Sequence, residues 1–362
     1  MKNTFGNTLT LTLFGESHGP AVGAVLDGLP PGLPVSEDSI ARRLARRRPS
    51  GPDATARREP DPFQILSGAY HGHTTGAPLA ISIPNTDVRS SDYPYGPARP
   101  SHADYPAAIR YHGFQDPRGG GHFSGRLTAP IVAVTAILLD ALAARGIRIG
   151  THILRCADVP DRPFATSPAD LANDLDLLDS APFPALSPSA PDAMTAAILA
   201  AKADRDSVGG ITQTAILGLP PGLGEPWFDS LESLLAHALF SLGGVKGIEF
   251  GDGFALAAMR GSQANDPLRA DPSATPPVRT LTNHSGGING GLSNGMPILF
   301  QCAVKPTATI PRPQPTIDLR TFQDATITPA GRHDPAIVRR IPPCIDALTS
   351  LVLSDLLLLH SP

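Results

Sequence analysis

The stretch SGRLTAPIVAVTAILLDALAARG, Ser124–Gly146, is apolar almost all the way round when it is wound as a helix. Such a pattern predicts a helix buried on every side, and Gly146 is the type of residue that commonly ends one. Outward from this stretch, hairpin-like strands mix with helices without a repeating βαβ order. That order favours an α+β fold over a doubly wound parallel sheet.

The flanking segments show the periodicities of strands and helices. LTLTLF at 9–14 and AVGAVLDGLPPG at 21–32 predict an opening hairpin. SEDSIARRLARRR at 36–48 predicts a helix with Ser36 as its N-cap and one apolar side. The remaining predicted elements are strands at 63–70, 77–83, 209–220, 254–260 and 297–305, and helices at 192–203, 228–242 and 344–360.

Loops and a proline-rich segment separate these elements. Seven prolines between Asp158 and Pro191 indicate a surface excursion or a connection between domains. Long loops are predicted at 84–105, 261–295 and 311–333, and loops of that length are usually functional or disordered. The chain length of 362 residues allows one large domain or two.

Composition excludes several classes of protein. Hydrophobic residues make up 41% and charged residues 17%, as in a compact soluble chain, and the net charge of −4 provides no basic field for nucleic acid. There is no run of 18 apolar residues and no secretory signal, so we expect a cytoplasmic protein without a membrane span. The three cysteines lie far apart without a C-x-x-C pair, so neither a disulfide framework nor a metal site is predicted.

Arginine is concentrated in the first part of the chain. Twelve of the 25 arginines fall between Arg42 and Arg126, whereas the whole chain has four lysines. A guanidinium pairs bidentately with carboxylates and phosphates, so this concentration indicates a small polyanionic ligand. The alternative is a solvated, charged helix face, which the pattern alone favours.

The pentapeptide GESHG, Gly15–Gly19, matches the G-x-S-x-G pattern of the serine hydrolase elbow, with Ser17 as the nucleophile. That elbow requires several strands before it and a helix directly after it. Here one short strand precedes Ser17, and a segment with strand character follows. A serine hydrolase is therefore a weak alternative.

Several short motifs occur together and in order along the chain. They are FGESHG, RRRP, RREPD, NTDVRSSDY, RPSHADY, RGGGHFSGR, GLGEPWFD, VKGIEFGDGF, NHSGGINGG, KPTAT and GRHDP. With these motifs the sequence resembles the chorismate synthase family, and the resemblance runs from about Asn3 to about Leu358. It implies a single domain over residues 1–362, built as a sandwich of antiparallel sheets and helices with long functional loops.

The resemblance also implies an activity. Members of this family catalyse the last step of the shikimate pathway, in which 5-enolpyruvylshikimate 3-phosphate loses phosphate and a ring hydrogen to give chorismate. The family requires reduced FMN although the reaction has no net redox change, and either NADPH or an external reductase supplies the reduced flavin. Its members are typically homotetramers. A paralogue that binds flavin without catalysing the reaction is the second alternative.

Carried over residue by residue, the resemblance assigns three catalytic groups. His18 in GESHG protonates the departing phosphate, and imidazole suits that task because its ordinary pKa lies close to neutral pH. His102 in RPSHADY lies near flavin N1 and the C2 carbonyl, where it balances the charge of the reduced ring. Asp334 in GRHDP accepts a proton near flavin N5. Asp334 followed by proline is also the pattern of a helix N-cap, and we expect both roles.

The substrate carries two carboxylates and a phosphate, so its site is expected to be lined with arginines. The substrate-binding residues that match the family's motifs are Ser17, Arg47, Arg48, Arg58, Arg126 and Arg332. The flavin-binding residues that match are His122, Phe123, Ser124, Gly243, Gly244, Gly290, Lys305, Pro306, Thr307, Ala308, Thr309 and Arg332.

Some positions depart from the family's usual pattern. His122 and Phe123 stand where an arginine and a serine are usual, and residues 243–244 are Gly-Gly where Asn-Ala is usual. An arginine is absent near Asp53, which weakens the expectation of a second nicotinamide contact there. Asp346 replaces a usual glutamate in the last helix.

Overall fold

The apolar stretch at 124–146 forms helix α3, Thr128–Ala144, behind a short 3-10 turn, η3, Gly125–Leu127. A computed structural model of the chain describes residues 2–55, 60–88, 93, 95–272, 274–331 and 333–359. Twelve consecutive or near-consecutive residues of α3 are buried, as the sequence predicts. Gly146 follows the helix with a φ of +80°, a conformation that glycine adopts without strain.

The first sheet lies on one side of α3. It has the strand order β1-β2-β3-β7-β4 and is antiparallel throughout. Its strands are β1 Thr4–Phe5, β2 Thr10–Gly15, β3 Ala21–Asp27, β7 Leu79–Pro84 and β4 Gln64–Ser67. Helix α1, Glu37–Arg47, packs beside α3, and the Ser36 hydroxyl accepts the N–H of Ser39 as the predicted N-cap.

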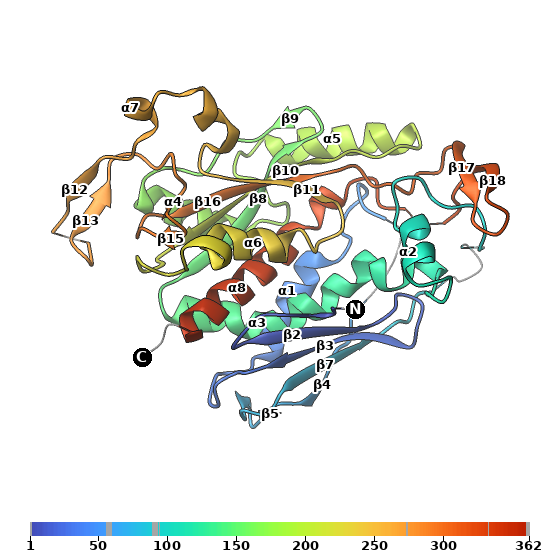
Figure 1. The fold of residues 1–362 in the computed structure, drawn as a ribbon, viewed down its shortest axis with the longest axis horizontal. Coiled ribbons are helices and arrows are strands. Elements are labelled where there is room, and N and C mark those ends of the chain that lie inside the picture. The colour runs from blue at the N-terminus through green and yellow to red at the C-terminus, as the bar shows by residue number, and fades with distance from the viewer. Residues whose placement is uncertain are drawn as a thin grey trace.

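The second sheet lies on the other side of the central helices, with the antiparallel order β11-β16-β10-β8-β9. Its strands are β11 Val245–Phe250, β16 Ile298–Val304, β10 Gly210–Leu217, β8 Arg148–Cys156 and β9 Val159–Pro160. Helices α8, Pro342–Leu359, and α6, Leu231–Leu239, pack against its inner side, while α4, Pro168–Ser180, and α5, Ala190–Ala203, pack beside β8 and β9 (Figure 1). The predicted sandwich of antiparallel sheets and helices is thereby confirmed.

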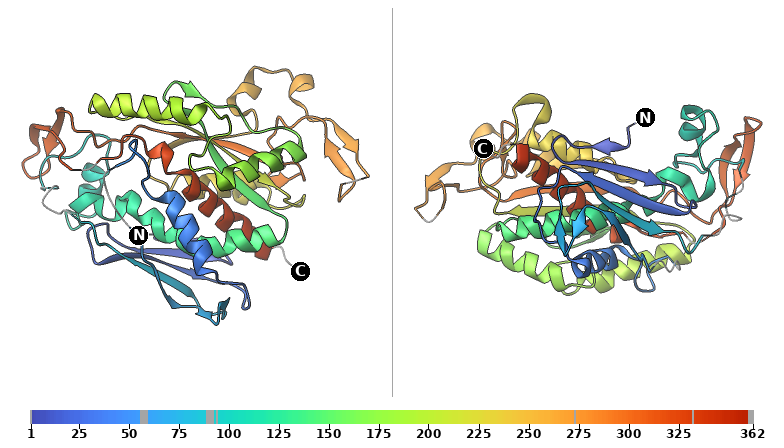
Figure 2. Two further views of the ribbon diagram at one scale, coloured as in Figure 1. Left: turned by 180° about the vertical axis from the view of Figure 1, so that it is seen from behind. Right: turned by 90° about the horizontal axis from the view of Figure 1, so that it is seen from below.

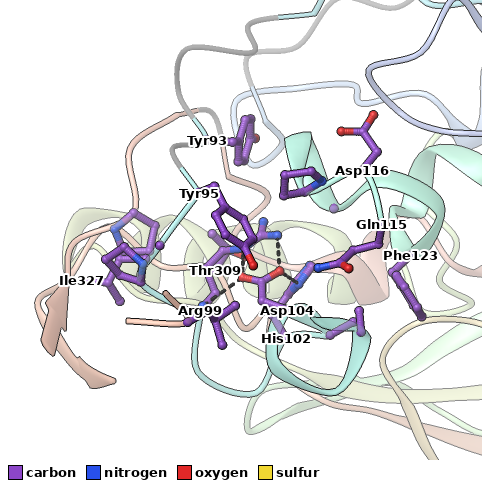
Figure 3. Close-up of a pocket in the computed structure, with 18 of the residues that line it drawn as sticks. Tyr93, Tyr95, Arg99, His102, Asp104, Gln115, Asp116, Phe123, Thr309 and Ile327 are labelled. Atoms are coloured by element: carbon purple, nitrogen blue, oxygen red, sulfur yellow. Dashed lines mark hydrogen bonds and ion pairs between the residues drawn. The ribbon is translucent and has the colours of Figure 1, made fainter. Parts of the chain in front are cut away.

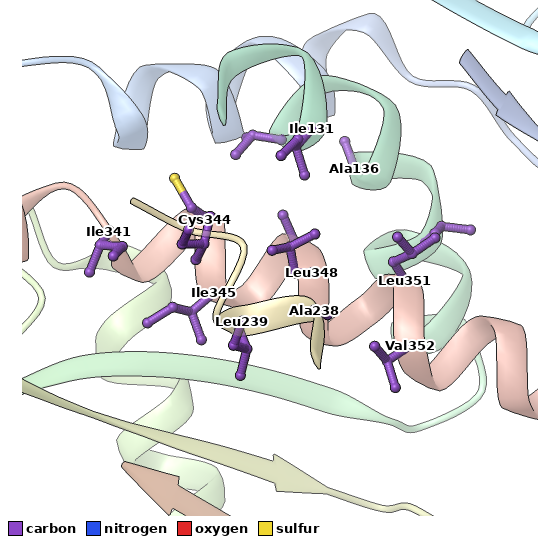
Figure 4. Close-up of a cluster of buried hydrophobic side chains, with 14 of the residues drawn as sticks. Ile131, Ala136, Ala238, Leu239, Ile341, Cys344, Ile345, Leu348, Leu351 and Val352 are labelled. Carbon is purple, nitrogen blue, oxygen red and sulfur yellow. The ribbon is translucent and has the colours of Figure 1, made fainter. Parts of the chain in front are cut away.

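One large hydrophobic core fills the space between the two sheets. Leu348 of α8 points toward α3, whereas Ile345 and Val352 lie on the side of α6 (Figure 4). The turned views in Figure 2 show α3 and α8 running between the sheets. Because these two helices are the middle layer, both sheets depend on their apolar faces.

Two helical stretches among the described residues are long and apolar enough to cross a membrane, Gly125–Ala144 and Pro342–Leu359. Their apolar windows are 72% and 89% buried inside the protein. Core helices have the same length and composition, and burial accounts for the apolar character of both.

The structure corrects two sequence predictions. The predicted strand at 254–260 is wrong: η5, Gly253–Ala258, is a 3-10 turn, and the strand of this region is β11, which ends just before it. Gly251 and Gly253 turn the chain there with φ of +58° and +50°, so the apolar pattern that follows has no sheet partner. The proline-rich segment at 158–191 contains helix α4, whose leucines pack onto the second sheet rather than lying in a surface excursion.

The long loops carry short elements. They are β5 Ala69–Tyr70, β6 His73–Thr74, α2 Asp104–Arg110, η2 Arg118–Phe123, η4 Trp227–Asp229, α7 Gly261–Ala264, β12 Leu268–Ala270, β13 Val278–Thr280, β14 Ile288–Asn289, β15 Leu292–Ser293, β17 Gln314–Asp318, β18 Gln323–Ile327 and η6 Ile337–Arg339. Helix α2 and the β17–β18 hairpin project at the same end of the molecule (Figure 1). The candidate site lies at this end.

Candidate active site

Two adjoining pockets, of about 240 and 150 Å³, lie between the central helices and the loops around α2. Five residues line both pockets: Tyr93, Arg99, His102, Phe123 and Thr309. The smaller pocket is drawn in Figure 3. The larger one reaches α1, α3 and the start of α8, so it collects residues from distant parts of the sequence.

GESHG forms the turn between β2 and β3, which are antiparallel neighbours. The chain therefore passes from strand to strand at Ser17, and the strand-to-helix elbow of a serine hydrolase is absent there. The Ser17 hydroxyl donates to the carbonyl of Arg118 over 3.4 Å, and the Ser17 N–H donates to the carbonyl of Gly121 over 3.1 Å. These bonds attach the turn to the glycine-rich segment that precedes α3.

Three consecutive glycines, Gly119–Gly121, form a wall between the two candidate catalytic histidines. Their φ values are +61°, +96° and +53°, in the region that favours glycine. A Cβ on Gly119 would lie 2.4 Å from Nε2 of His18, and a Cβ on Gly120 would lie 3.3 Å from Cε1 of His102. The bare backbone thus lets both histidines approach the same segment.

His18 is buried, with 7% of its surface exposed. Its ring meets the ring of Tyr93 edge to face at 5.2 Å between centroids. Asp116 lies close enough for the charge of His18 to act on it, although the hydrogen bond from Arg118 is the main reason that the pKa of Asp116 is lowered. Asp116 is therefore a charged neighbour of His18 at the glycine wall.

A single buried carboxylate, Asp61, holds three of the candidate arginines. Arg126 donates to its Oδ1, and Nη1 of Arg47 lies 3.5 Å from its Oδ2. Nε of Arg48 lies 3.7 Å from Oδ2, while Nε of Arg47 also donates to the Thr128 hydroxyl over 2.8 Å. Among the described residues, this cluster has one carboxylate and three guanidinium groups, and Arg47 and Arg126 both line the larger pocket.

Arg47 remains charged in this environment. Burial, together with the nearby charge of Arg340, lowers the pKa of Arg47 to about 10, which is still well above neutral pH. Arg340 in turn donates from Nη1 to Asp334 over 2.9 Å and from Nε to the carbonyl of Arg47 over 3.1 Å. Arg340 therefore connects the arginine cluster to the third candidate catalytic group.

Asp334 lines the larger pocket, as its predicted role requires. Its Oδ1 accepts the N–H of Ala336 over 3.3 Å. The following turn is the 3-10 segment η6, whose N-cap position is Ala336. The predicted helix N-cap at Asp334 is thus wrong. One carboxylate oxygen caps only a local turn, and the other accepts a hydrogen bond from Arg340.

Several flavin-binding candidates line the larger pocket and fit a polar, flat ligand. Phe123, Ser124, Gly243, Thr307 and Thr309 all face it. The Thr307 hydroxyl is buried and has no hydrogen-bond partner among the described residues, as expected of a group that binds a ligand. The chemistry of these groups fits FMN, which offers polar ring edges and a phosphate to hydroxyls and backbone N–H groups.

Other flavin candidates lie outside the pocket lining. Nδ1 of His122 is 2.9 Å from the carbonyl of Gly15, so this ring joins the glycine segment to β2. Lys305 donates to the carbonyl of Ser101 over 2.7 Å, one residue before His102. Gly244, Pro306 and Ala308 flank the lining residues without lining either pocket, as does the substrate candidate Arg48.

Gly290 belongs to the turn between β14 and β15, which form a separate two-stranded sheet, and β15 lies at the end of the molecule away from α2 (Figure 1). A Cβ added there would have no neighbour within 4 Å. Within this chain the structure does not bring Gly290 to the pockets. Arg58 and Arg332, both predicted to bind substrate, lie outside the described residues.

Sequence reasoning missed four residues that the structure places at the site. Asp61 and Arg340 organise the arginines, Asp104 contacts His102, and Tyr93 packs on His18. The motifs RREPD, RPSHADY and NTDVRSSDY contain three of them, Asp61, Asp104 and Tyr93. The roles of Asp61, Arg340 and Tyr93 depend on contacts between segments far apart in sequence, whereas Asp104 contacts Arg99 and His102 within one motif.

The fold and the site define an α+β enzyme with an arginine-lined cleft for a small anionic substrate. The sequence profile of the chorismate synthase family matches residues 9–358. Relatives named chorismate synthase include those of Aeropyrum pernix, 45% identical over 99% of this chain and 93% of the relative, and Desulfovibrio desulfuricans, 44% identical over 99% and 97%. A crystal structure of chorismate synthase matches with a TM-score of 0.78 and 28% identity, covering 98% of this chain and 93% of that chain.

The chain belongs to the chorismate synthase family. The family's enzymes are carbon–oxygen lyases that convert 5-enolpyruvylshikimate 3-phosphate to chorismate with loss of phosphate, and this chain has that function. Reduced flavin is a requirement of the family.

Proposed function

We propose that the two adjoining pockets are the active site and that His18, His102 and Asp334 perform the proton chemistry of chorismate synthesis. The observation that carries this proposal is convergence. Arg47, His102 and Asp334 come from three separate parts of the chain and line the same pocket, and His18 contacts its glycine wall. A binding surface without catalysis would not need two proton-transfer groups lining one cavity and a third against its wall.

The arginine cluster supports the binding of the substrate. The substrate has two carboxylates and a phosphate, and guanidinium groups bind both in a bidentate manner. Arg47 and Arg126 are held in place by Asp61, so they lose little conformational freedom when the substrate binds. We assign Ser17, Arg48, Arg58 and Arg332 to the same task on their match to the family's motifs.

His18 is the proposed acid for the leaving phosphate. In the reaction a ring carbon–oxygen bond breaks as phosphate leaves, and a ring carbon–hydrogen bond breaks as the new double bond forms. A proton on His18 neutralises the charge that develops on the departing oxygen. Asp334, fixed by Arg340, is the proposed proton acceptor in the lining of the larger pocket.

FMN fits the residues that line the larger pocket. Phe123, Ser124, Gly243, Thr307 and Thr309 would hold it there. The chemistry that reduced FMN supplies when bound is an electron for the departing phosphate and a place for the ring hydrogen, without net redox change. His102 would stabilise the negative charge of the reduced ring.

The proposal extends to the setting of the enzyme. We propose a cytoplasmic homotetramer, as is typical of the family, with NADPH as a possible source of electrons for the flavin. Asp53 lies near the place where the family usually has a further arginine. Its side chain is buried, and its Oδ2 lies 3.4 Å from Nε of Arg339. This carboxylate therefore turns inward, so a nicotinamide contact would rest on the arginines of RRRP.

Alanine substitutions of the two histidines test the proposal. His18→Ala and His102→Ala are each expected to slow turnover by about a hundredfold or more, the usual scale for loss of a proton-transfer group. The matched control is His284→Ala, because His284 also pairs with an aspartate, at 2.6 Å from Asp252, but lines neither pocket. Turnover is measured anaerobically with reduced FMN. Wild-type rates in both active-site variants would contradict the assignment.

A further inference from the structure

Asp104 is the first residue of α2 and contacts His102 directly. Its Oδ1 lies 2.8 Å from Nδ1 of His102. Arg99 holds the same carboxylate: its Nη2 donates to Oδ1 over 2.7 Å, while its Nε and backbone N–H donate to Oδ2 over 2.8 and 2.9 Å. Figure 3 shows the three side chains joined at the edge of the pocket.

A purely local role for Asp104 does not explain this arrangement. An aspartate in the first turn of a helix commonly satisfies the free N–H groups there. The N-cap position of α2 is Ala103, which makes no side-chain cap bond, and the oxygens of Asp104 bind Arg99 and His102 instead. The carboxylate therefore acts on the histidine rather than on the helix.

The protonation of Asp104 decides which nitrogen of His102 carries hydrogen. Burial opposes ionisation of the carboxyl, but the hydrogen bonds from Arg99 and His102 outweigh it and hold the pKa of Asp104 well below its usual range. An ionised carboxylate can only accept hydrogen bonds. Nδ1 of His102 must therefore be the donor, which leaves Nε2 as the nitrogen beside the glycine wall, 3.5 Å from where a Cβ on Gly120 would lie.

We propose that Asp104, held by Arg99, is a positioning residue for His102, fixing its proton on Nδ1 and presenting Nε2 to the ligand pocket. This inference rests on the proposed function in that His102 faces the flavin. With Nδ1–H bound to a carboxylate, Nε2 accepts a hydrogen bond when the ring is neutral. When the ring carries a second proton, Asp104 lies directly against it and Nε2 presents an N–H to the ligand pocket.

Asp104→Asn tests the inference because it reverses the hydrogen bond. Two Arg99 donors require an oxygen at Oδ2 but only one, Nη2, meets Oδ1, so the new amide nitrogen takes the place of Oδ1 beside His102. An amide nitrogen donates, and it would force Nδ1 to accept and move the proton to Nε2. We expect ¹⁵N NMR of flavin-free, histidine-labelled protein at alkaline pH to show the Nδ1–H form in the wild type and the Nε2–H form in the variant. His102→Gln assigns the signals.

Two functional readouts accompany the spectra. The variant is expected to bind reduced FMN at least about tenfold more weakly while its affinity for oxidised FMN changes much less, and turnover is expected to fall at least about tenfold. Asp252→Asn is the matched control, because it alters the pair with His284 outside both pockets. It should change the spectrum of His284 and leave flavin affinity and turnover as in the wild type.

The outcomes separate the inference from the proposed function. A wild-type His102 with its proton on Nε2 overturns the inference, and this measurement needs no folded variant. The inference is also overturned if the His102 proton moves to Nε2 in Asp104→Asn while the affinity for reduced FMN and the turnover stay unchanged. If His102→Ala retains full turnover, the proposed role of His102 fails whatever the position of the proton.

Discussion

Asp346 of α8 offers a quantitative test of how this protein tolerates a buried carboxyl in its middle layer. Its Oδ1 accepts the Thr151 hydroxyl over 2.6 Å, and Thr151 in turn bonds Thr214 over 2.8 Å. Burial raises the pKa of Asp346 to about 6, despite the opposing charge of Arg46. The ordinary value is near 3.8. Between these two pKa values the carboxyl of Asp346 keeps its proton in the folded protein, whereas the same carboxyl has already lost its proton in the unfolded chain.

The sign of the effect follows from proton linkage. Between about pH 4 and pH 6 the unfolded state holds fewer protons at this site, so the free energy of unfolding falls as the pH rises. Each pKa unit is worth about 1.4 kcal/mol, so the full loss above pH 6 is about 3 kcal/mol. Asp346→Asn cannot ionise and escapes this loss. Its stability relative to the wild type should thus increase by about 2–3 kcal/mol between about pH 4 and pH 8.

Urea unfolding of both proteins at the two pH values measures this difference, and effects of other carboxyls cancel between them. Asp176→Asn is the control, because Asp176 is an exposed partner of Arg148 at 2.7 Å. An exposed pair contributes little, so this variant should change by less than about 1 kcal/mol at either pH. An equal stability difference for Asp346→Asn at both pH values would refute the argument, because it would mean that Asp346 titrates as an ordinary aspartate.

Three further substitutions probe the structure around the site. Asp61→Asn removes the carboxylate that pairs with buried guanidinium groups. We expect urea unfolding to show a free energy of unfolding lower by about 3–5 kcal/mol, together with a raised KM. An unchanged KM would contradict the role of Asp61 in holding Arg126. Gly119→Ala places a Cβ 2.4 Å from Nε2 of His18, at a residue whose φ is +61°. Turnover should therefore fall at least about tenfold, whereas a fully active variant would show that the glycine wall can move. Asp355→Ala removes the carboxylate that accepts three backbone N–H groups near the N-terminus. It should lower the free energy of unfolding by about 2–4 kcal/mol, whereas a loss below about 1 kcal/mol would show that water replaces the carboxylate as acceptor.

Local patterns predicted most of the regular elements because those patterns also hold in the folded protein. The hairpin around GESHG, the capped helix at 36–48 and the buried helix after Ser124 each formed where the sequence predicted them. The strand β8 gave no clear local signal. The apolar segment at 254–260 gave a misleading one, because glycine turns on its N-terminal side end the pairing with the sheet.

The sequence could predict those site residues that stand in recognisable motifs. His18, His102 and Asp334 stand in separate motifs, and the fold brings them to one glycine wall and one pocket. Asp61 could not be assigned beforehand, because its contacts with Arg47 and Arg126 join segments far apart in sequence. Asp104 stands in one motif with Arg99 and His102, but the sequence alone does not show which groups its carboxylate contacts.

The most direct test of the central claim is an anaerobic assay of the purified chain with reduced FMN and 5-enolpyruvylshikimate 3-phosphate. Asp334 and the arginines that line the larger pocket, with His18 against its glycine wall, predict release of phosphate and chorismate in equal amounts. Repeating the assay with oxidised FMN and NADPH shows whether the protein reduces its own flavin. No phosphate release from folded protein saturated with reduced FMN would contradict the account and identify a paralogue that binds flavin without catalysis.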